Sequence, residues 1–231
     1  MATRAREDNV RIVIDAEQSW YQPVIDSLTD ELMQSCNRIE DGAPPVCIAS
    51  FQAYLRRYPQ LLEHQIRRAD EKGYTLLFKQ VRGAYMVTEA ERWEHEGREG
   101  PNPVWATKAE TDATFNHGID KTLATVADQV RQTGHSRIGA VFAMHNSLSI
   151  DHGIKSLEHY RLGRRIQGDD RLHLSPEAAS SFAFAQLYGM KDDLTKRVVA
   201  SLITDGNHPL VMKVGRLIPR ERDSWNLTVL R

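Results

Sequence analysis

Residues 76–86 read Leu-Leu-Phe-Lys-Gln-Val-Arg-Gly-Ala-Tyr-Met, an apolar run that closes with two cations, two small residues and a tyrosine. This pattern is typical of a buried strand that carries polar residues at its carboxyl end. In parallel α/β proteins the active site lies beyond the carboxyl ends of the strands, so these polar residues are the first candidates for function. They are Lys79, Arg82 and Tyr85.

Four other apolar runs end in the same way. They cover residues 10–14, 46–51, 138–144 and 182–185, and the polar residues that follow them include Asp15, Gln52, His145, Asn146 and Gln186. A sixth apolar run covers residues 210–214. The repeated pattern indicates that several strand ends contribute to one site.

Segments with helical spacing separate these runs. Helices are expected at residues 22–39, 59–72, 107–132, 149–162 and 192–203, with a polar loop from about 86 to 103. Gly134 is expected to end the third helix, and Asp192 or Asp193 to cap the last one.

The alternation of strands and helices predicts a parallel sheet with right-handed crossovers, in a single domain over residues 1–231. The first strand is followed by Asp-Ala-Glu-Gln rather than a G-x-G-x-x-G turn. A (β/α)8 barrel is therefore favoured over a doubly wound nucleotide-binding sheet. Only six strands are found where a closed barrel needs eight, so we expect an incomplete barrel with exposed strand edges.

Composition limits the classes of partner. The 231 residues are 41% hydrophobic, which suits a sizeable core, and 30 basic against 31 acidic residues give a formal charge of -1. There is no net field to attract nucleic acid. The group Arg161, Arg164 and Arg165 is followed by Asp169 and Asp170 and is interpreted as a solvated surface.

The two cysteines, Cys36 and Cys47, lack metal-site spacing and suit a reducing compartment. No metal site is predicted. No apolar run approaches the ~20 residues that span a bilayer. The N-terminal residues do not read as a signal or transit peptide, because acidic residues and a strand follow at once.

Five stretches, in this order, resemble the proline dehydrogenase family. They are Val-Ile-Asp-Ala-Glu-Gln (13–18), Phe-Gln-Ala-Tyr-Leu (51–55), Lys-Gln-Val-Arg-Gly-Ala-Tyr-Met (79–86), Phe-Ala-Met-His-Asn (142–146) and Phe-Ala-Gln-Leu-Tyr-Gly-Met (184–190). The resemblance covers about residues 10–205 and is greater to eukaryotic members, including fungal ones, than to bacterial ones.

The resemblance implies a barrel that holds FAD at its mouth and oxidises L-proline to pyrroline-5-carboxylate. Hydride passes to flavin N5 and the electrons then pass to a membrane quinone, which implies a peripheral association with the membrane. The likeness to eukaryotic members implies a mitochondrial location. By resemblance, the cofactor contacts are Gln52, Lys79, Val81, Gly83, Ala84, His145, Asn146 and Gln186. Tyr85 and Leu187 would pack on the substrate ring, and Asp15 would organise the pocket, so that Lys79, Asp15 and Tyr85 form the catalytic group.

Physical arguments support some of these roles and offer alternatives to others. A cation at Lys79 would stabilise negative charge on a reduced flavin. Small residues at 83 and 84 leave room for a flat cofactor. Asp15 has the alternative of capping a helix, and His145 that of a buried, hydrogen-bonded histidine. Val81 and Leu187 have the alternative of ordinary core positions.

The sequence also departs from the family. The resemblance implies that two strands at the front and a final helix with paired arginines, which clamp the substrate carboxylate, are missing. Residues 214–231 diverge, and Arg220 and Arg222 do not reproduce that pair. Met144 stands where the family usually has Ser or Thr.

Two alternatives of other classes stay open: a catalytically inactive fragment of the enzyme, and another flavin-binding barrel oxidoreductase. The preference between proline and hydroxyproline, the electron acceptor and the oligomeric state are also open.

Overall fold

The computed structural model describes residues 2–8, 10–204, 211–214 and 227–230. The chain forms two compact units, one of residues 1–115 with 219–231 and one of residues 116–218. The six strands expected from the sequence are all present. They are β1 (Arg11–Ile14), β2 (Cys47–Gln52), β3 (Leu76–Val81), β4 (Ile138–Ala143), β7 (Phe182–Leu187) and β9 (Val211–Val214).

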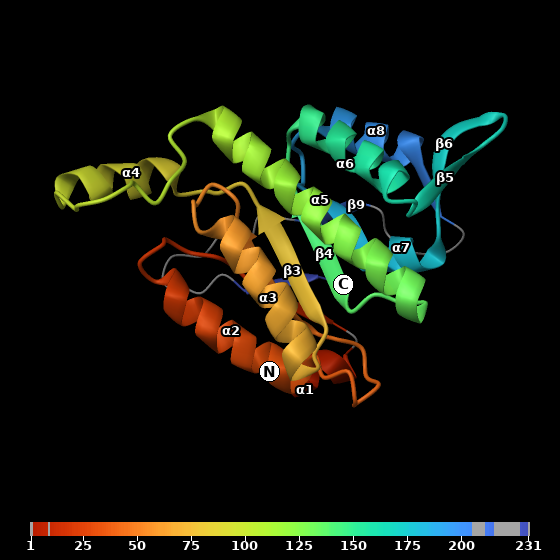
Figure 1. Ribbon diagram of the computed structural model, residues 1–231, viewed down its shortest axis with the longest axis horizontal. Helices are drawn as coiled ribbons and strands as arrows, with labels where there is room; N and C mark the ends of the chain where they lie inside the picture. Colours follow the sequence, from red (N-terminus) through yellow and green to blue (C-terminus); the bar gives the residue numbers. More distant parts are fainter. Residues whose placement is uncertain (1, 9, 205–210, 215–226, 231) are drawn as a thin grey trace. The chain divides into compact units, whose positions relative to one another are not determined.

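In the first unit, β1, β2 and β3 pair in parallel in that order. Helices α2 (Gln22–Cys36) and α3 (Tyr58–Lys72) make the crossovers and run beside these strands (Figure 1). Both helices carry proline in their first turn, where its missing N–H costs nothing. Gly73 ends α3 in the left-handed conformation, with φ of +69°.

The strands of this unit alternate between two faces. Ala49 and Phe51 line a small cavity together with residues of α2 and α3, so this face meets the helices. On the other face Val13, Ile48 and Leu77 form a buried cluster. The same alternation places Asp15, Ser50 and Lys79 in a layer above that cluster, toward the carboxyl ends. Such layers of inward-facing side chains are what a barrel interior requires.

The outer edge of β1 is paired rather than exposed. Strand β10 (Leu227–Leu230) runs antiparallel to β1, with Arg11 opposite Leu230 and Ile14 opposite Leu227. The expectation of an open edge was therefore wrong at this strand, and the tail expected to be divergent contributes a strand. Pairing satisfies backbone groups that would otherwise recruit another chain.

The first unit also contains α1 (Ala2–Glu7) and α4 (Met86–His95). The prediction of a polar loop over residues 86–103 was wrong in its first half. The charged residues of α4 give its sequence a loop-like composition, but most of them face solvent, whereas Glu89 is buried. When an inward-facing position of a helix is polar, the apolar stripe is interrupted there, so the spacing of apolar residues did not predict α4.

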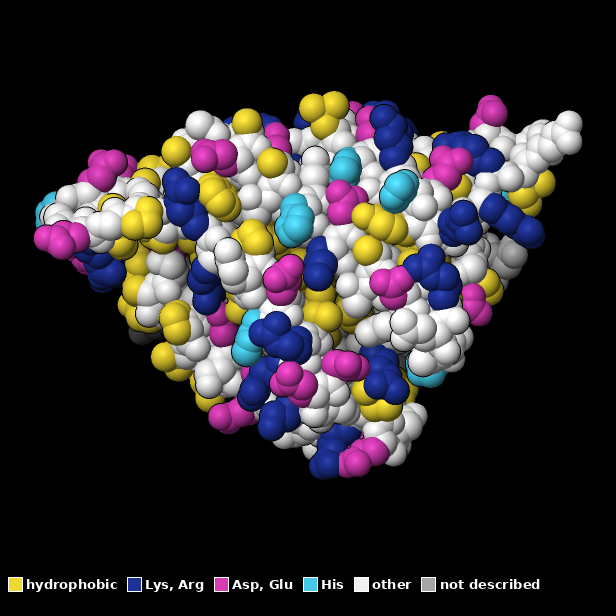
Figure 2. Space-filling model, viewed as in Figure 1, with side chains coloured by type: hydrophobic (Ala, Val, Ile, Leu, Met, Phe, Trp, Pro, Cys, Tyr) yellow, Lys and Arg dark blue, Asp and Glu magenta, His cyan; other side chains and the backbone are white. Residues whose placement is uncertain are grey.

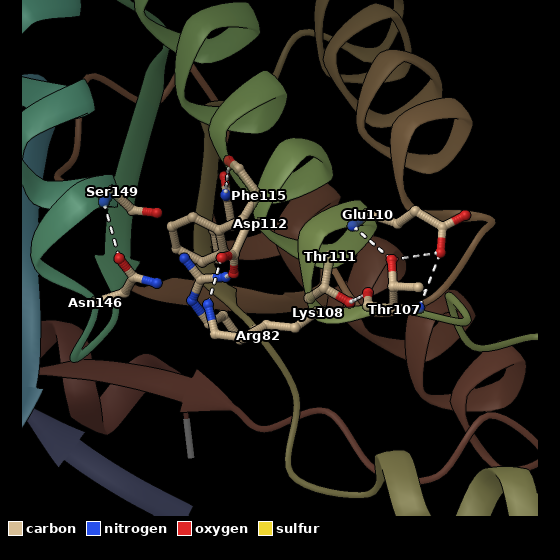
Figure 3. A network of polar contacts seen from close by, with 10 residues as sticks. Arg82, Thr107, Lys108, Glu110, Thr111, Asp112, Phe115, Asn146 and Ser149 are labelled. Atoms are coloured by element: carbon tan, nitrogen blue, oxygen red, sulfur yellow. Dashed lines mark hydrogen bonds and ion pairs between the residues drawn. The ribbon is translucent and has the colours of Figure 1, made fainter.

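The long helix α5 (Lys108–Thr133) begins and ends as predicted. Thr107 and Glu110 form a capping box, because each accepts a hydrogen bond from the other's backbone N–H, at 2.9 and 3.2 Å (Figure 3). Gly134, with φ of +79°, follows its last turn.

In the second unit β4, β7 and β9 pair in parallel in that order. Helix α6 (Ser147–His159) follows β4, and α7 (Pro176–Ser181) precedes β7. A separate sheet contains β5 (Gly163–Ile166), β6 (Asp169–Leu174) and β8 (Leu202–Thr204). Strands β5 and β6 were not predicted because they form a charged, largely exposed hairpin without an apolar run. Strand β8 was not predicted because residues 202 and 203 were assigned to the preceding helix, which ends at Ser201 instead.

Helix α8 (Asp192–Ser201) occupies its predicted place, but its predicted cap was wrong. The residue at the cap position is Lys191, whose φ is +52°, and its side chain makes no capping hydrogen bond. Asp192 and Asp193 lie in the first turn instead, where their charge favours the helix dipole.

Surface charge agrees with the composition. Basic and acidic side chains are interspersed on the face in Figure 2. In the hairpin, Arg165 pairs with Glu158 at 3.1 Å and donates to the Asp170 carbonyl oxygen at 2.7 Å. The interpretation of this arginine group as a solvated surface is consistent with these exposed pairs.

Candidate active site

The carboxyl ends of β1 and β3 are joined by an ion pair. The ammonium group of Lys79 on β3 contacts the carboxylate of Asp15, which directly follows β1. Their side chains are 19% and 28% exposed. Partial burial strengthens such a pair relative to a surface one, and water can still reach it. Two of the predicted catalytic residues therefore act on each other.

Tyr85 joins the same group. Its hydroxyl hydrogen-bonds the Glu17 carboxylate. Burial raises the pKa of Tyr85 to about 12, and the hydrogen bond to Glu17 and the negative charges of Glu17 and Asp15 add to the shift. The hydroxyl is therefore a stable proton donor at neutral pH. The residues that follow β1 thus supply two carboxylates, Asp15 to Lys79 and Glu17 to Tyr85.

Gln52, at the end of β2, is buried beside this group. Its Nε2 donates to the backbone oxygen of Glu17 at 2.8 Å and to the hydroxyl of Tyr54 at 3.2 Å. Its Oε1 is buried and has no hydrogen-bond partner among the described residues. Such an atom needs an explanation, and a bound ligand is one.

The Tyr54 hydroxyl in turn donates to Glu89 of α4 at 3.3 Å. The Glu89 carboxylate also accepts hydrogen bonds from the backbone N–H of Ser19, at 2.6 Å, and from its hydroxyl. Glu89 is only 2% exposed. These contacts attach α4 to the tails of β1 and β2, next to the predicted catalytic group.

The glycine of the Arg-Gly-Ala-Tyr stretch has a structural explanation. Gly83 has a φ of +146°, which side chains rarely adopt, and a Cβ atom there would lie 1.7 Å from the ring of Tyr54. Close packing on Tyr54 therefore requires glycine whether or not a cofactor is present. Ala84 is exposed and Val81 is half-buried, so both are accessible to a ligand.

Arg82, which is close to Lys79 and Tyr85 in sequence, makes an ion pair with a residue of α5. Its guanidinium pairs with Asp112 of α5 and lies 4.7 Å from the centre of the Phe115 ring (Figure 3). Burial lowers the pKa of this guanidinium, and the charge of Asp112 opposes that shift. Arg82 therefore fastens the end of β3 to α5.

In the second unit, His145 and Leu187 connect the ends of β4 and β7. The backbone N–H of Leu187 donates to Nε2 of His145 at 3.2 Å. In a neutral ring this contact assigns the proton to Nδ1. The Leu187 side chain is 40% exposed. It lies on the face of β7 opposite to Phe184, which packs against Gly153 of α6.

Asn146 and Gln186 both have partners within this unit. The Asn146 side chain caps α6 by accepting from the backbone N–H of Ser149 at 3.2 Å. Gln186 accepts a hydrogen bond from the hydroxyl of Thr195 on α8. Its Nε2 is buried and has no partner among the described residues. The cofactor roles of these residues stay predictions.

Sequence reasoning missed three members of the first unit's network, namely Glu17, Tyr54 and Glu89. The spacing in the sequence was a signal for Glu89. It lies four residues after Tyr85, about one turn of a helix, so a helix at this place would bring the two residues to the same side.

Arg220 and Arg222 lie outside the described residues. In the described part of the chain, no three His, Cys, Asp or Glu side chains gather as metal ligands, and no helix has the length and hydropathy of a membrane span.

Comparison with known proteins gives consistent results. A family model described as "Proline dehydrogenase" matches residues 1–216. "Proline dehydrogenase 1, mitochondrial" of Dictyostelium discoideum is 31% identical over 192 residues, which are 82% of this chain and 29% of that protein. "Hydroxyproline dehydrogenase" of Xenopus laevis is 26% identical over 195 residues, covering 84% of this chain and 37% of that protein.

A solved structure of proline utilization A from Bdellovibrio bacteriovorus, inactivated by N-propargylglycine, superposes with a TM-score of 0.68 at 23% identity. The matched region covers 93% of this chain and 19% of the chain in that structure. The likeness confirms the predicted fold, an α/β structure of the (β/α)8-barrel type with part of the barrel present. The chain spans about 30% of the length of the curated D. discoideum relative.

Proposed function

Because the chain belongs to the proline dehydrogenase family, we propose that it oxidises L-proline to pyrroline-5-carboxylate. FAD would supply the flavin N5 that accepts the hydride, and a quinone would take the electrons onward. The names of the mitochondrial relatives support a mitochondrial location, with peripheral contact to the membrane that carries the quinone.

The residues present fit a flavin. Within the first unit, Gln52 offers a buried acceptor atom that has no partner among the described residues. Within the second unit, Gln186 offers a buried donor atom that likewise has none there. Lys79 offers a partly buried cation, and the exposed Ala84 and half-buried Val81 offer small apolar surface. We assign Gln52, Lys79, Val81, Gly83, Ala84, His145, Asn146 and Gln186 to cofactor binding.

The observation that carries the proposal is the contact of Lys79 with Asp15, beside Tyr85. Asp15 holds the lysine ammonium at the carboxyl ends of the strands, where it would stabilise the negative charge that a flavin gains when it accepts the hydride. The cation is positioned before the reaction, so little reorganisation is needed during it. Removing one such preorganised group typically costs about 3 kcal/mol of transition-state stabilisation.

Substrate contacts are assigned to Tyr85, Leu187 and Asp15. The Tyr85 ring would pack on the saturated ring of proline while Glu17 orients its hydroxyl. Leu187 would supply a second apolar contact, which its partial exposure allows. Asp15 would act through Lys79 and through the charge balance of the pocket.

The first experiment records the visible spectrum of the chain after it is expressed with FAD and freed of unbound flavin. Retained flavin that bleaches when L-proline is added supports the proposed activity. Retained flavin that stays oxidised with both proline and hydroxyproline would favour the inactive-fragment alternative. If bleaching occurs with another reductant such as a reduced pyridine nucleotide, but not with proline, a different flavin-dependent oxidoreductase activity is favoured.

A further inference from the structure

The hydrogen bonds of the Gln52 amide fix which of its ends is available to a ligand. Its Nε2 faces two acceptors, the Glu17 backbone oxygen and the Tyr54 hydroxyl oxygen. Both amide protons are therefore used. Rotating the amide by 180° would place Oε1 against the Glu17 carbonyl oxygen, and two acceptors cannot satisfy each other. Oε1 is consequently the end without a protein partner among the described residues.

The Tyr54 hydroxyl oxygen accepts a hydrogen bond from Gln52 while the hydroxyl proton points to another group. The hydroxyl donates to Glu89, which as a carboxylate can only accept. Burial and the nearby Glu89 charge raise the pKa of Tyr54, so the hydroxyl keeps its proton. The lone pairs of the tyrosine oxygen are thereby left for the Gln52 amide.

Glu89 is itself held as an acceptor. The backbone N–H and the hydroxyl of Ser19 both donate to its carboxylate, and with Tyr54 they make three donors on two oxygens. This is the environment that an ionised carboxylate needs when it is buried. The ring of Tyr54 is fixed as well, since it is fully buried and the backbone of Gly83 packs against it.

We propose that Glu89 and Tyr54 are positioning residues, which orient the Gln52 amide so that Oε1 presents a hydrogen-bond acceptor to an N–H group of the bound flavin. The chain of contacts runs from Ser19 through Glu89 and Tyr54 to Gln52. This inference rests on the proposed function for the identity of the ligand. The orientation of the amide is a property of the first unit alone and can be tested without a ligand.

The test without a ligand uses the side-chain amide signals of Gln52 in nuclear magnetic resonance spectra of the unliganded chain. Both Nε2 protons are expected to exchange slowly with water, because both are hydrogen-bonded and buried. In Tyr54→Phe, which keeps the ring and deletes the hydroxyl, one of them should shift and exchange faster. Unchanged Gln52 signals in Tyr54→Phe would overturn the proposal.

The test with a ligand measures FAD affinity by flavin fluorescence in a double-mutant cycle. Tyr54→Phe is expected to weaken FAD binding roughly tenfold, the value of about one net hydrogen bond. Glu89→Gln should weaken it similarly. Gln52→Met deletes the acceptor itself, so adding Tyr54→Phe to Gln52→Met should cause no further loss. Losses that multiply would mean that Tyr54 acts independently of Gln52 and would overturn the proposal.

Tyr74→Phe is the matched control. It deletes another buried tyrosine hydroxyl of the first unit, one that bonds Asp30 at 2.9 Å, away from Gln52. It should leave FAD affinity unchanged, and an equal loss would show a general effect of stability instead of positioning. If the unsubstituted chain retains no FAD, the proposed cofactor is wrong, and the amide signals alone then decide the positioning.

Discussion

Lys79 on β3 and Asp15 at the tail of β1 form an ion pair across β2, whose Ser50 is the register partner of Lys79. The pair joins two strand ends that are 64 residues apart in the sequence. Holding a cation in this way reduces the entropy lost when it meets developing negative charge. Its orientation follows from the alternation of side chains in parallel strands.

Replacing Lys79 by methionine tests the electrostatic role. Lys79→Met keeps the aliphatic stem and removes the charge, so flavin reduction by proline is expected to slow about 100-fold, while FAD affinity falls only a few-fold. Stopped-flow bleaching of the flavin measures the first effect, and fluorescence titration the second. The exposed Lys108, which pairs with Asp112, supplies the control Lys108→Met, expected to change neither. Parallel losses in both quantities for Lys79→Met would contradict a role specific to the reaction.

Tyr85 predicts a dependence of stability on alkaline pH. Its pKa is raised from 10.0 to about 12, so the folded state favours the protonated hydroxyl. The resulting stabilisation is fully present below pH 10 and is lost as the pH rises through about 12. The free energy of unfolding of the unsubstituted chain should therefore exceed that of Tyr85→Phe by less at pH 11 than at pH 8.

Urea unfolding at the two pH values measures this difference. Tyr21→Phe is the control, because the Tyr21 side chain is 60% exposed and its substitution should have the same small effect at both values. A difference for Tyr85→Phe that does not change between pH 8 and pH 11 would contradict the raised pKa that burial and the neighbouring carboxylates give to Tyr85.

The strands and the main crossover helices could be predicted because their signals are local. Residues 76–81 are apolar enough to be buried on both faces, and Thr107 with Glu110 and Gly134 mark the ends of α5. Helix α4 and the β5–β6 hairpin could not, because their many charged residues leave no clear apolar run or stripe, and a buried charged residue is explained only by contacts that the sequence does not show. Glu89, for example, is buried by contacts with Ser19 and Tyr54.

The members of the site were easier to predict than their contacts. Lys79, Asp15, Tyr85 and Gln52 stand at strand ends, and the first unit brings all four together. The partners of these residues depend on the path of the chain after each strand ends. The periodicity of apolar residues does not predict that path. Arg82 illustrates this, because it directly follows β3 and its guanidinium pairs with Asp112 of α5.

Gly83 should be intolerant of substitution for a reason of packing. Gly83→Ala would place a methyl group against the Tyr54 ring at a φ of +146°, so a loss of about 2–4 kcal/mol in unfolding free energy is expected. Gly100→Ala is a matched control, because Gly100 also has a positive φ, +93°, but no atom lies within 4 Å of its Cβ position. Denaturant unfolding of both variants measures the difference. Equal losses would show that backbone conformation alone, without the contact to Tyr54, determines the effect.

Asn37 is expected to be a large contributor to the stability of the first unit. Its side chain is 1% exposed and makes four hydrogen bonds to backbone groups of residues 46, 47 and 75, at 2.7–3.1 Å. These contacts tie the start of β2 to the start of β3. Asn37→Ala leaves several buried groups unpaired and should cost at least about 3 kcal/mol.

Thermal or denaturant unfolding measures this loss, with Asn102→Ala as the control. Asn102 is a loop residue whose side chain accepts one backbone hydrogen bond, at 3.0 Å from the N–H of Val104, so its loss should be near 1 kcal/mol. A loss for Asn37→Ala no larger than that of the control would mean that water replaces the missing contacts.

Asn146 allows its structural and its proposed cofactor role to be separated. The side chain caps α6, and serine is an equally good capping residue, so Asn146→Ser should leave the unfolding free energy nearly unchanged. Asn146→Ala should lower it by about 1 kcal/mol. If the amide also contacts FAD, as we propose, both variants should weaken FAD binding by a similar factor, because both lack it. Titration of FAD alongside denaturant unfolding distinguishes the two roles. If FAD affinity falls only in Asn146→Ala, the variant that also loses stability, and not in Asn146→Ser, then Asn146 has only the capping role.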